Sequence, residues 1–337
     1  MMNRWAAMLL LAGVLGALPA RAAFINGRSY TAMSDWASAN NFRLQARQPG
    51  AAIYTNRAQA KIAVYKDSRV AKINGVNVAL SFPVAYDRGA LFISQFDLAK
   101  TVTPLIIGQR NSKPVKVICI DPGHGGKDTG NVVGYRAEKT YTLLLAQELA
   151  AQLKSAGYKV ILTRTRDTYP ELSERADIAN RNNADLFLSL HFNAVASGKS
   201  EVSGVETYCI TPVGASSSNS EGRGAGYGST PGNRMENKSL LLAFLVQKAL
   251  VKGIEAEDRA VRRARFAVLR DAEMPAILIE SGYMTHPIEG KKIFDAVYRQ
   301  QTAKAIARGI NDYIKLTGST APTSSSVSKK PTATSAK

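Results

Sequence analysis

Two histidines and two glutamates carry the chemistry that this sequence suggests. His124 lies in the glycine-rich segment 121–126, directly after an apolar run, and Glu138 stands where the next helical stretch begins. His191 and Glu280 each follow an apolar run in the same way. In a parallel α/β sheet, ligands collect at the carboxyl ends of the strands. We therefore expect the four side chains to meet at one edge of a sheet.

Three ligands of the His, Glu, His type suit a hydrolytic zinc site, because they leave one coordination position open for water. Zinc lowers the pKa of that water to about 7 and polarises a substrate carbonyl. A further carboxylate must take the proton and deliver it to the leaving nitrogen, and Glu280 is the candidate for this acid/base. The alternative is that all four are ordinary polar residues at strand ends and helix starts. Two of the 3 His fall at matched positions, which favours the site.

Strands that alternate with helices must position these residues. Strand-like apolar runs occur at 115–120, 159–163, 186–190, 205–210 and 276–279. Helical spacing is found in 138–156, 172–179, 240–251 and 306–314. This alternation is typical of an α/β fold with a mainly parallel twisted sheet flanked by helices. We predict that residues 115–316 form the catalytic domain.

A small β-rich domain is predicted for residues 24–105. Its short apolar runs are broken by the turn signals Asn74-Gly75 and Asp87-Arg88-Gly89. Segments 73–80 and 86–93 resemble the N-terminal domain of copper amine oxidase type that is found on some exported bacterial proteins. This part of the chain has no His and no Cys, so we expect no chemistry in it.

Residues 1–22 have the features of a secretory signal peptide. Arg4 precedes an apolar stretch of roughly 14 residues, and Ala20-Arg-Ala22 provides an Ala-x-Ala cleavage site. The stretch is shorter than the ~20 residues that span a bilayer. We therefore expect cleavage after Ala22 and no transmembrane segment in the mature chain. The predicted destination is the periplasm, the cell envelope or the extracellular space.

The protein is strongly basic, with 44 Lys and Arg against 26 Asp and Glu and a formal net charge of +18. Loss of Arg4 and Arg21 with the signal would leave +16. The export signal and the lack of a nucleic-acid-binding motif weigh against nucleic acid as a partner. Anionic envelope polymers are the better candidates for the partner that this charge attracts.

The cysteines leave their state open. With only 3 His and 2 Cys, the chain cannot form a Cys-rich zinc module or a dense disulfide framework. Cys119 and Cys209 both lie in predicted strands. An exported protein permits a disulfide between them, but two buried free thiols fit the sequence equally well.

Two segments interrupt the regular pattern. Residues 212–237 are rich in Gly, Ser and Asn, so we expect a long mobile loop. This loop lies between His191 and Glu280 in the chain, and we predict a lid over the site rather than an inhibitory helix. Residues 317–337 consist mainly of Ser, Thr, Pro, Ala and Lys, which predicts a disordered tail.

Several spaced motifs resemble those of one family, the zinc-dependent N-acetylmuramoyl-L-alanine amidases of the amidase 3 type. The resemblance covers about residues 115–316. The motifs are Ile120-Asp-Pro-Gly-His-Gly-Gly-Lys-Asp128, Glu138 at a helix start, Thr163-Arg164 with Asp167, Leu172-x-x-Arg175, Ala184-Asp185, Ser189-Leu-His-Phe-Asn-Ala194 and Ile279-Glu-Ser-Gly-Tyr283.

The resemblance implies that His124, Glu138 and His191 bind Zn²⁺ and that Glu280 is catalytic. It also implies the substrate, which is the amide between the lactyl group of N-acetylmuramic acid and L-alanine in peptidoglycan. The expected protein is therefore a hydrolase that degrades cell wall. The alternatives are a zinc peptidase that acts on peptidoglycan stem peptides and a non-catalytic cell-wall-binding protein.

Four further residues are candidates for supporting the metal or the substrate. Asp121 and Asn193 flank the two histidines, and metal-bound imidazoles usually donate their second N–H to a carboxylate or carbonyl. Arg270 is a candidate for contacting substrate carboxylates, although fixing a loop by an ion pair is the favoured role for this arginine.

His286 lies six positions after Glu280, where the family usually has Asn, and a structural role is favoured over a place in the site. Ala260 stands where the family usually has Gly.

Overall fold

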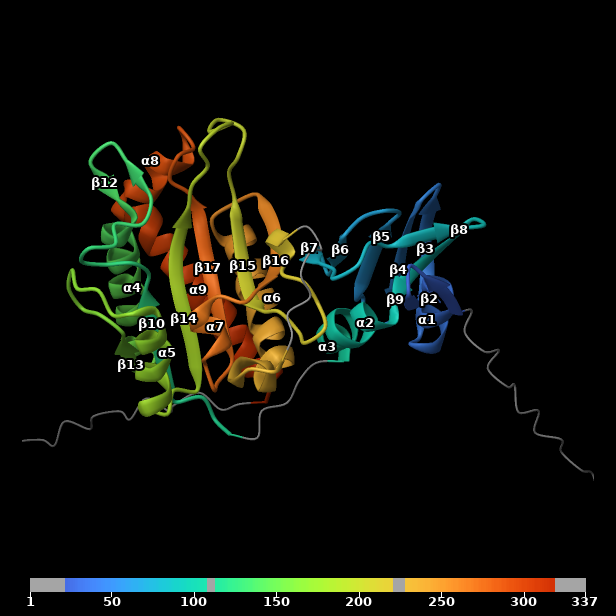
Figure 1. Ribbon diagram of the computed structural model, residues 1–337, viewed down its shortest axis with the longest axis horizontal. Helices are drawn as coiled ribbons and strands as arrows, with labels where there is room; N and C mark the ends of the chain where they lie inside the picture. Colours follow the sequence, from blue (N-terminus) through green and yellow to red (C-terminus); the bar gives the residue numbers. More distant parts are fainter. Residues whose placement is uncertain (1–21, 108–112, 221–227, 319–337) are drawn as a thin grey trace, which may run out of the picture.

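The computed structural model describes residues 22–107, 113–220 and 228–318, which form an α/β domain and, beside it, a smaller β-rich domain (Figure 1). Most of the predicted signal and of the predicted tail lies outside the described residues. Thr317 belongs to the folded part, because it is buried and its hydroxyl donates to the Tyr313 carbonyl at the end of the last helix. No helix among the described residues is both long and apolar enough to cross a membrane.

The α/β domain is built on six strands in the order β13, β10, β14, β17, β15, β16. Their bounds are β10 Val117–Pro122, β13 Lys159–Leu162, β14 Leu186–Asn193, β15 Val205–Ile210, β16 Asp258–Ala264 and β17 Ala276–Tyr283. Every neighbouring pair is parallel except β15 and β17, which are antiparallel. The predicted mainly parallel sheet is therefore confirmed.

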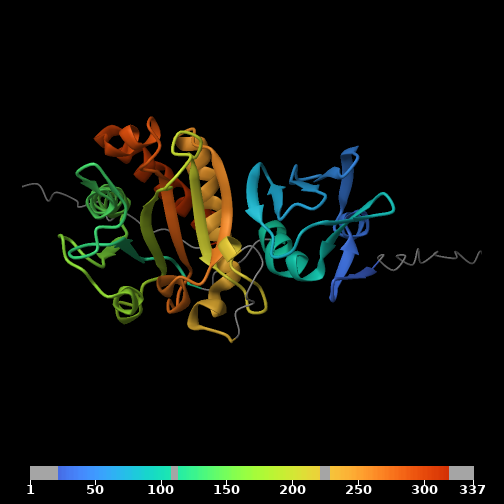
Figure 2. The same ribbon diagram turned by 45° about the horizontal axis from the view of Figure 1, so that its top comes forward.

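Helices cover both faces of this sheet (Figure 2). One face packs against α4 Glu138–Ser155, α6 Glu236–Gly253 and α9 Ala296–Leu316, and the other against α5 Leu172–Arg181 and α7 Ala267–Arg270. Successive side chains of a strand point to opposite faces. In β10, Ile118 and Ile120 accordingly join the first core and Cys119 the second. The domain also contains the short helix α8 Glu289–Phe294 and a hairpin of β11 Val132–Val133 and β12 Arg136–Ala137. Two short 3-10 helices, η2 Ser218–Ser220 and η3 Pro231–Met235, lie between β15 and α6.

The N-terminal domain contains β1 Ala22–Ile25, β2 Arg28–Ala32, α1 Met33–Ala39, β3 Phe42–Gln48, β4 Ala51–Asn56, β5 Lys61–Tyr65, β6 Val70–Ile73, β7 Val76–Ala79, β8 Ala85–Asp87, β9 Ala90–Ser94, α2 Gln95–Asp97, the π-helical turn η1 Leu98–Val102 and α3 Thr103–Ile107. The predicted turn at Asn74-Gly75 joins β6 to β7, and both residues have positive φ, as a tight hairpin turn requires. Strands β1, β2, β9 and β8 form a separate four-stranded sheet.

One sheet runs through both domains. Strand β7 pairs with β16, with Val78 opposite Val261, so the strands from β3 to β7 extend the α/β sheet to eleven strands. The side chain of Asp258 accepts from the Asn77 backbone N–H at 2.7 Å, and Lys100 forms an ion pair with Glu236 across the same junction. The sequence predicted two domains but gave no sign of this shared sheet.

The predicted lid over the site does not match the topology. Because β15 is antiparallel to β17, its carboxyl end lies at the edge opposite to that of β14 and β17. The loop that follows β15 therefore leaves from that opposite edge. Among its described residues, Pro212 and Ala215 accept from Arg265, and Ser218 accepts from the Arg263 backbone. The connection 194–204, between β14 and β15, lies at the edge where β14 ends.

Candidate metal centre

Three ligand atoms from different elements converge at the carboxyl edge of the sheet. His124 follows β10, Glu138 begins α4, and His191 lies near the end of β14. Glu138 Oε1 lies 3.1 Å from His124 Nε2 and 3.1 Å from His191 Nδ1, and the two nitrogens are 3.2 Å apart. Among the described residues, these three form the group of His, Cys, Asp and Glu side chains that could hold a metal ion.

His124 is held by the loop that carries it. Its backbone φ is +62°, and its Nδ1 lies 2.8 Å from Asp128 Oδ2. A carboxylate at Nδ1 favours the tautomer with its proton on that nitrogen, which leaves Nε2 free for a metal. Burial alone would lower the pKa of His124, but Glu138 and Asp128 raise it above its ordinary value.

Glu138 is almost fully buried and well supported by hydrogen bonds. Its Oε2 accepts from the backbone and side-chain nitrogens of Asn131, and its Oε1 accepts from the Phe192 backbone. Burial alone would raise the pKa of this carboxyl, but the hydrogen bonds and positive charge of His124 and His191 hold the pKa well below its ordinary value. Glu138 is therefore a carboxylate at neutral pH, which is the form that binds a metal.

Glycines let the backbone pass close to the ligands. A Cβ on Gly123 would lie 2.3 Å from Cε1 of His191, and a Cβ on Gly130 would lie 2.6 Å from Cδ2 of His124 and 2.7 Å from Oε2 of Glu138. No side chain fits at either position without moving a ligand. Glycine is therefore required here for close approach rather than for turn geometry alone.

Glu280 lies beside this cluster in the sheet, because it stands opposite His191 in the pairing of β14 with β17. The residue is half-buried, yet its Oε2 is sealed from solvent and has no hydrogen-bond partner among the described residues. Burial, together with the negative charges of Glu138 and Glu206, raises the pKa of Glu280 well above its ordinary value. An unpartnered oxygen with a raised pKa suits a group that takes and returns a proton.

Glu206 is a second buried carboxylate beside Glu280. It stands opposite Glu280 in the pairing of β15 with β17 and is 3% exposed. Arg262 of β16 forms an ion pair with its Oε2 at 2.7 Å, and Asn193 and Tyr208 donate to its Oε1. Both carboxylate oxygens of Glu206 thus have partners, whereas Glu280 Oε2 has none among the described residues.

Asp121 does not contact either histidine. Its carboxylate is buried and accepts from Thr163, Arg175 and Ser189 at 2.5–2.8 Å, which ties β10 to its neighbours. Arg175 also donates to the His124 carbonyl. Asp128, four residues after His124 in the same loop, supplies the carboxylate that was predicted beside a ligand.

The other candidates serve the scaffold. Asn193 donates to Glu206 and to the Tyr283 hydroxyl rather than accepting from His191. Arg270 forms a two-pronged ion pair with Asp271 in the connection from β16 to β17, at the edge opposite the metal centre.

His286 accepts at Nδ1 from the backbone N–H groups of Ile288 and Glu289 and so holds the start of α8. The favoured structural role of His286 is therefore supported by its contacts.

Sequence reasoning missed three residues of the centre, namely Asp128, Asn131 and Glu206. Asp128 belongs to the motif around His124, and its spacing of four residues was the signal that could have identified it. Asn131 and Glu206 carry no such signal, because their roles depend on a loop that folds back and on strand pairing.

The three ligands fit a zinc ion. Four tetrahedral ligands at about 2.0–2.1 Å from zinc stand about 3.3 Å apart. The observed separations of 3.1–3.2 Å are close to this value. Two imidazole nitrogens and one carboxylate oxygen are also donors that zinc prefers, and the set leaves one position for water or substrate.

Comparisons with known proteins point to one family. Residues 118–312 match the family model described as N-acetylmuramoyl-L-alanine amidase. The chain is 34% identical over 240 residues to the N-acetylmuramoyl-L-alanine amidase AmiC of Neisseria meningitidis, covering 65% of this chain and 57% of that protein. It is 31% identical over 222 residues to AmiA of Escherichia coli, covering 59% of this chain and 76% of the relative.

Two solved structures share the fold. An N-acetylmuramoyl-L-alanine amidase from Clostridium difficile 630 aligns with a TM-score of 0.51 at 34% identity, over 60% of this chain and 98% of that one. AmiC2 of Nostoc punctiforme aligns with a TM-score of 0.50 at 34% identity, over 60% of this chain and 99% of that one. These likenesses confirm the predicted α/β architecture.

Proposed function

The chain belongs to the N-acetylmuramoyl-L-alanine amidase family, and we propose that it hydrolyses the amide between N-acetylmuramic acid and L-alanine in peptidoglycan. The observation that carries the proposal is the convergence of His124 Nε2, His191 Nδ1 and Glu138 Oε1 at the sheet edge where Glu280 lies. We also propose that the protein is exported to the periplasm or cell envelope, since its substrate lies there and residues 1–22 read as a signal.

His124, Glu138 and His191 would hold a zinc ion. Zinc in this position would supply a Lewis acid for the substrate carbonyl and for a water molecule. Asp128 keeps Nε2 of His124 free of a proton, and Asn131 orients the Glu138 carboxylate by two hydrogen bonds. These two residues therefore prepare the ligands before a metal arrives.

Glu280 would move the proton in the reaction. Its carboxylate takes a proton from the attacking water and gives it to the amide nitrogen of L-alanine, so the leaving group departs as a neutral amine. Glu206, paired with Arg262, keeps a negative charge beside Glu280 and raises its proton affinity. The environment thus makes Glu280 a stronger base for the proton of the attacking water.

The test is digestion of purified peptidoglycan with analysis of the products. The amidase should release intact stem peptides that begin with L-alanine and leave the glycan strands uncut. Removal of the metal by a chelator should abolish the release, and added zinc should restore it. Activity that survives complete removal of metal would contradict the proposal, and release of single amino acids would favour a stem-peptidase.

Substitution at Glu280 separates catalysis from binding. We expect Glu280→Gln to lower kcat by about 10²–10⁴-fold, with zinc content and binding to peptidoglycan retained. Glu201→Gln, an exposed glutamate in the 194–204 connection, is the matched control and should leave kcat unchanged. Unchanged hydrolysis by Glu280→Gln would assign the proton transfer to another group.

A further inference from the structure

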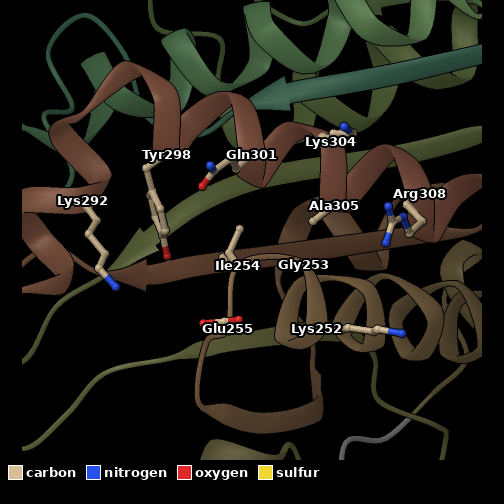
Figure 3. A pocket seen from close by; sticks show the side chains of 10 residues that line it. All are labelled: Lys252, Gly253, Ile254, Glu255, Lys292, Tyr298, Gln301, Lys304, Ala305 and Arg308. Carbon is tan, nitrogen blue, oxygen red and sulfur yellow. The ribbon is translucent and has the colours of Figure 1, made fainter.

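A second concave site lies on the helical face of the α/β domain, between the end of α6 and the first half of α9 (Figure 3). Its volume is about 640 Å³, and none of the metal-centre residues lines it. Binding pockets for small organic molecules span about 300–1,000 Å³. The cavity is therefore large enough for an organic ligand rather than only for a simple ion.

Positive charge dominates the pocket. Lys252, Lys292, Lys304 and Arg308 line it, whereas Glu255 is the one acidic residue in the lining, so the lining carries a net charge of +3. All four cations are exposed, and the Lys292 ammonium lies 5.9 Å from the centroid of the Tyr298 ring and acts electrostatically on Glu289. The partial negative charge at the end of a helix is about half an elementary charge. The partial negative charge at the end of α6 is therefore much smaller than the net +3 of the lining, and the pocket remains positive.

The rest of the lining offers hydrogen bonds and an apolar surface. Tyr298 extends from α9 toward the end of α6, and Gln301 stands one turn further along the helix (Figure 3). Burial raises the pKa of the Tyr298 hydroxyl, so the hydroxyl remains a neutral donor at physiological pH. Ile254 and Ala305 are buried and form an apolar part of the wall.

We propose that this pocket binds a phosphate-bearing polyol or sugar segment of a cell-envelope polymer. Four cations suit the several oxygens and the repeated negative charges of a phosphate-bearing polymer better than a single carboxylate. The Tyr298 ring and Ile254 provide a surface for the apolar face of a sugar or polyol. Glu255 and the last carbonyl groups of α6 would accept from its hydroxyl groups. The setting in the envelope rests on the proposed function, but the binding itself does not.

The experiment measures the affinity of the mature protein for a soluble poly(glycerol phosphate) oligomer and for vesicles that contain lipopolysaccharide. The pocket variant combines Lys252→Gln, Lys304→Gln and Arg308→Gln. The control variant combines Lys154→Gln, Lys159→Gln and Arg181→Gln, which removes the same charge from exposed positions outside the pocket. Both variants change only exposed side chains, so both should fold.

We expect saturable binding to at least one of the two probes, and the probe that binds identifies the source of the phosphate. The pocket variant should lose about tenfold or more in affinity, while the control variant stays within about twofold, because nearby charges act much more strongly than screened distant ones. An equal loss in both variants would overturn the pocket in favour of diffuse charge attraction. Absence of binding to both probes would overturn it as well.

Hydrolysis of a small soluble muramyl peptide provides an independent readout. Neither variant alters the metal centre, so both should hydrolyse this substrate at the wild-type rate. Loss of polymer binding with retained hydrolysis supports the pocket. A wild-type protein without amidase activity would contradict the proposed function, but it would leave the binding comparison valid.

Discussion

Among individual residues, Glu280 shows most clearly the conflict between stability and function. Its Oε2 has no hydrogen-bond partner among the described residues, and Glu138 and Glu206 add negative charge nearby. A buried carboxyl in such surroundings resists ionisation. In the metal-free protein, folding therefore raises the proton affinity of Glu280 above that in the unfolded chain, which makes stability depend on pH.

We expect metal-free Glu280→Gln to be more stable than metal-free wild type at high pH. Because the folded pKa of Glu280 is raised, its contribution to stability is fully present below the unfolded pKa near 4.5 and is lost as the pH rises through the folded value. Glutamine does not titrate, so the difference in Tm should be small near pH 4.5 and should grow toward pH 8. Glu201→Gln is the control, and a constant difference across this range would contradict the raised pKa.

We expect the contact between Asp128 and His124 to strengthen metal binding. Asp128→Asn removes the carboxylate that fixes the ring of His124, and loss of such a partner typically lowers metal affinity by 10–100-fold. Competition with a zinc-binding dye should show this loss, and excess zinc should restore activity. Asp312→Asn, on an exposed residue of α9, should have no effect. Unchanged affinity in Asp128→Asn would show that the ring is held by other contacts.

Individual ligands were predictable because each follows a recognisable run of residues. His124, His191 and Glu280 end apolar strands, and Glu138 begins a helix, so topology alone brings them to one edge. Asp121 was placed wrongly for a physical reason. It lies three residues before His124 near the end of β10, but strand side chains alternate between faces, and its own points to Thr163 and Ser189.

At the level of elements, β16 carries an unusual backbone. Ala260 has a φ of +84° in the middle of this strand, where the register with β15 shifts. The left-handed region is strained for any residue with a Cβ. The difference from the family at this position therefore has a structural consequence.

We expect Ala260→Gly to stabilise the protein by about 0.5–1 kcal/mol. The left-handed backbone costs alanine roughly 1–2 kcal/mol, and the extra chain entropy of glycine offsets about 0.5–1 kcal/mol of the gain. Ala264→Gly, in the same strand and without positive φ, should destabilise. Urea unfolding of both variants measures the two effects, and a destabilised Ala260→Gly would mean that the buried methyl group contributes more than the strain costs.

The elements that were missed lack the patterns on which prediction depends. Strand β16 has the sequence Asp-Arg-Ala-Val-Arg-Arg-Ala, and its charged residues conceal it among loops. The direction of β15 cannot be read from its own residues, because a fully buried strand looks the same in either orientation. The loop 212–237 was predicted to cover the site because the direction of β15 was not known from the sequence.

At the scale of the whole molecule, the two cysteines are kept apart by the sheet. Both are free and buried, Cys119 in the core beneath α5 and α7 and Cys209 in the core beneath α4, α6 and α9. Strands β14 and β17 lie between β10 and β15. Of the two states that the sequence left open, the structure has two buried thiols.

A thiol reagent should therefore find no reactive cysteine in the native protein and two after unfolding. Burial raises the pKa of Cys119 to about 12 and also raises that of Cys209, so neither forms a reactive thiolate at neutral pH. Titration with and without denaturant measures both states, and added reductant should not change the counts. A denatured count of zero that rises with reductant would reveal a disulfide.

The pairing of β7 with β16 also limits how the protein can be divided. A strand at the edge of a sheet offers unpaired backbone groups to any other chain, and proteins must cover or disrupt such edges. Here the N-terminal domain covers one edge of the catalytic sheet. The pairing therefore moves the free edge of this sheet from β16 to β3, and a truncation that starts near Val115 would expose the backbone groups of β16 to other chains.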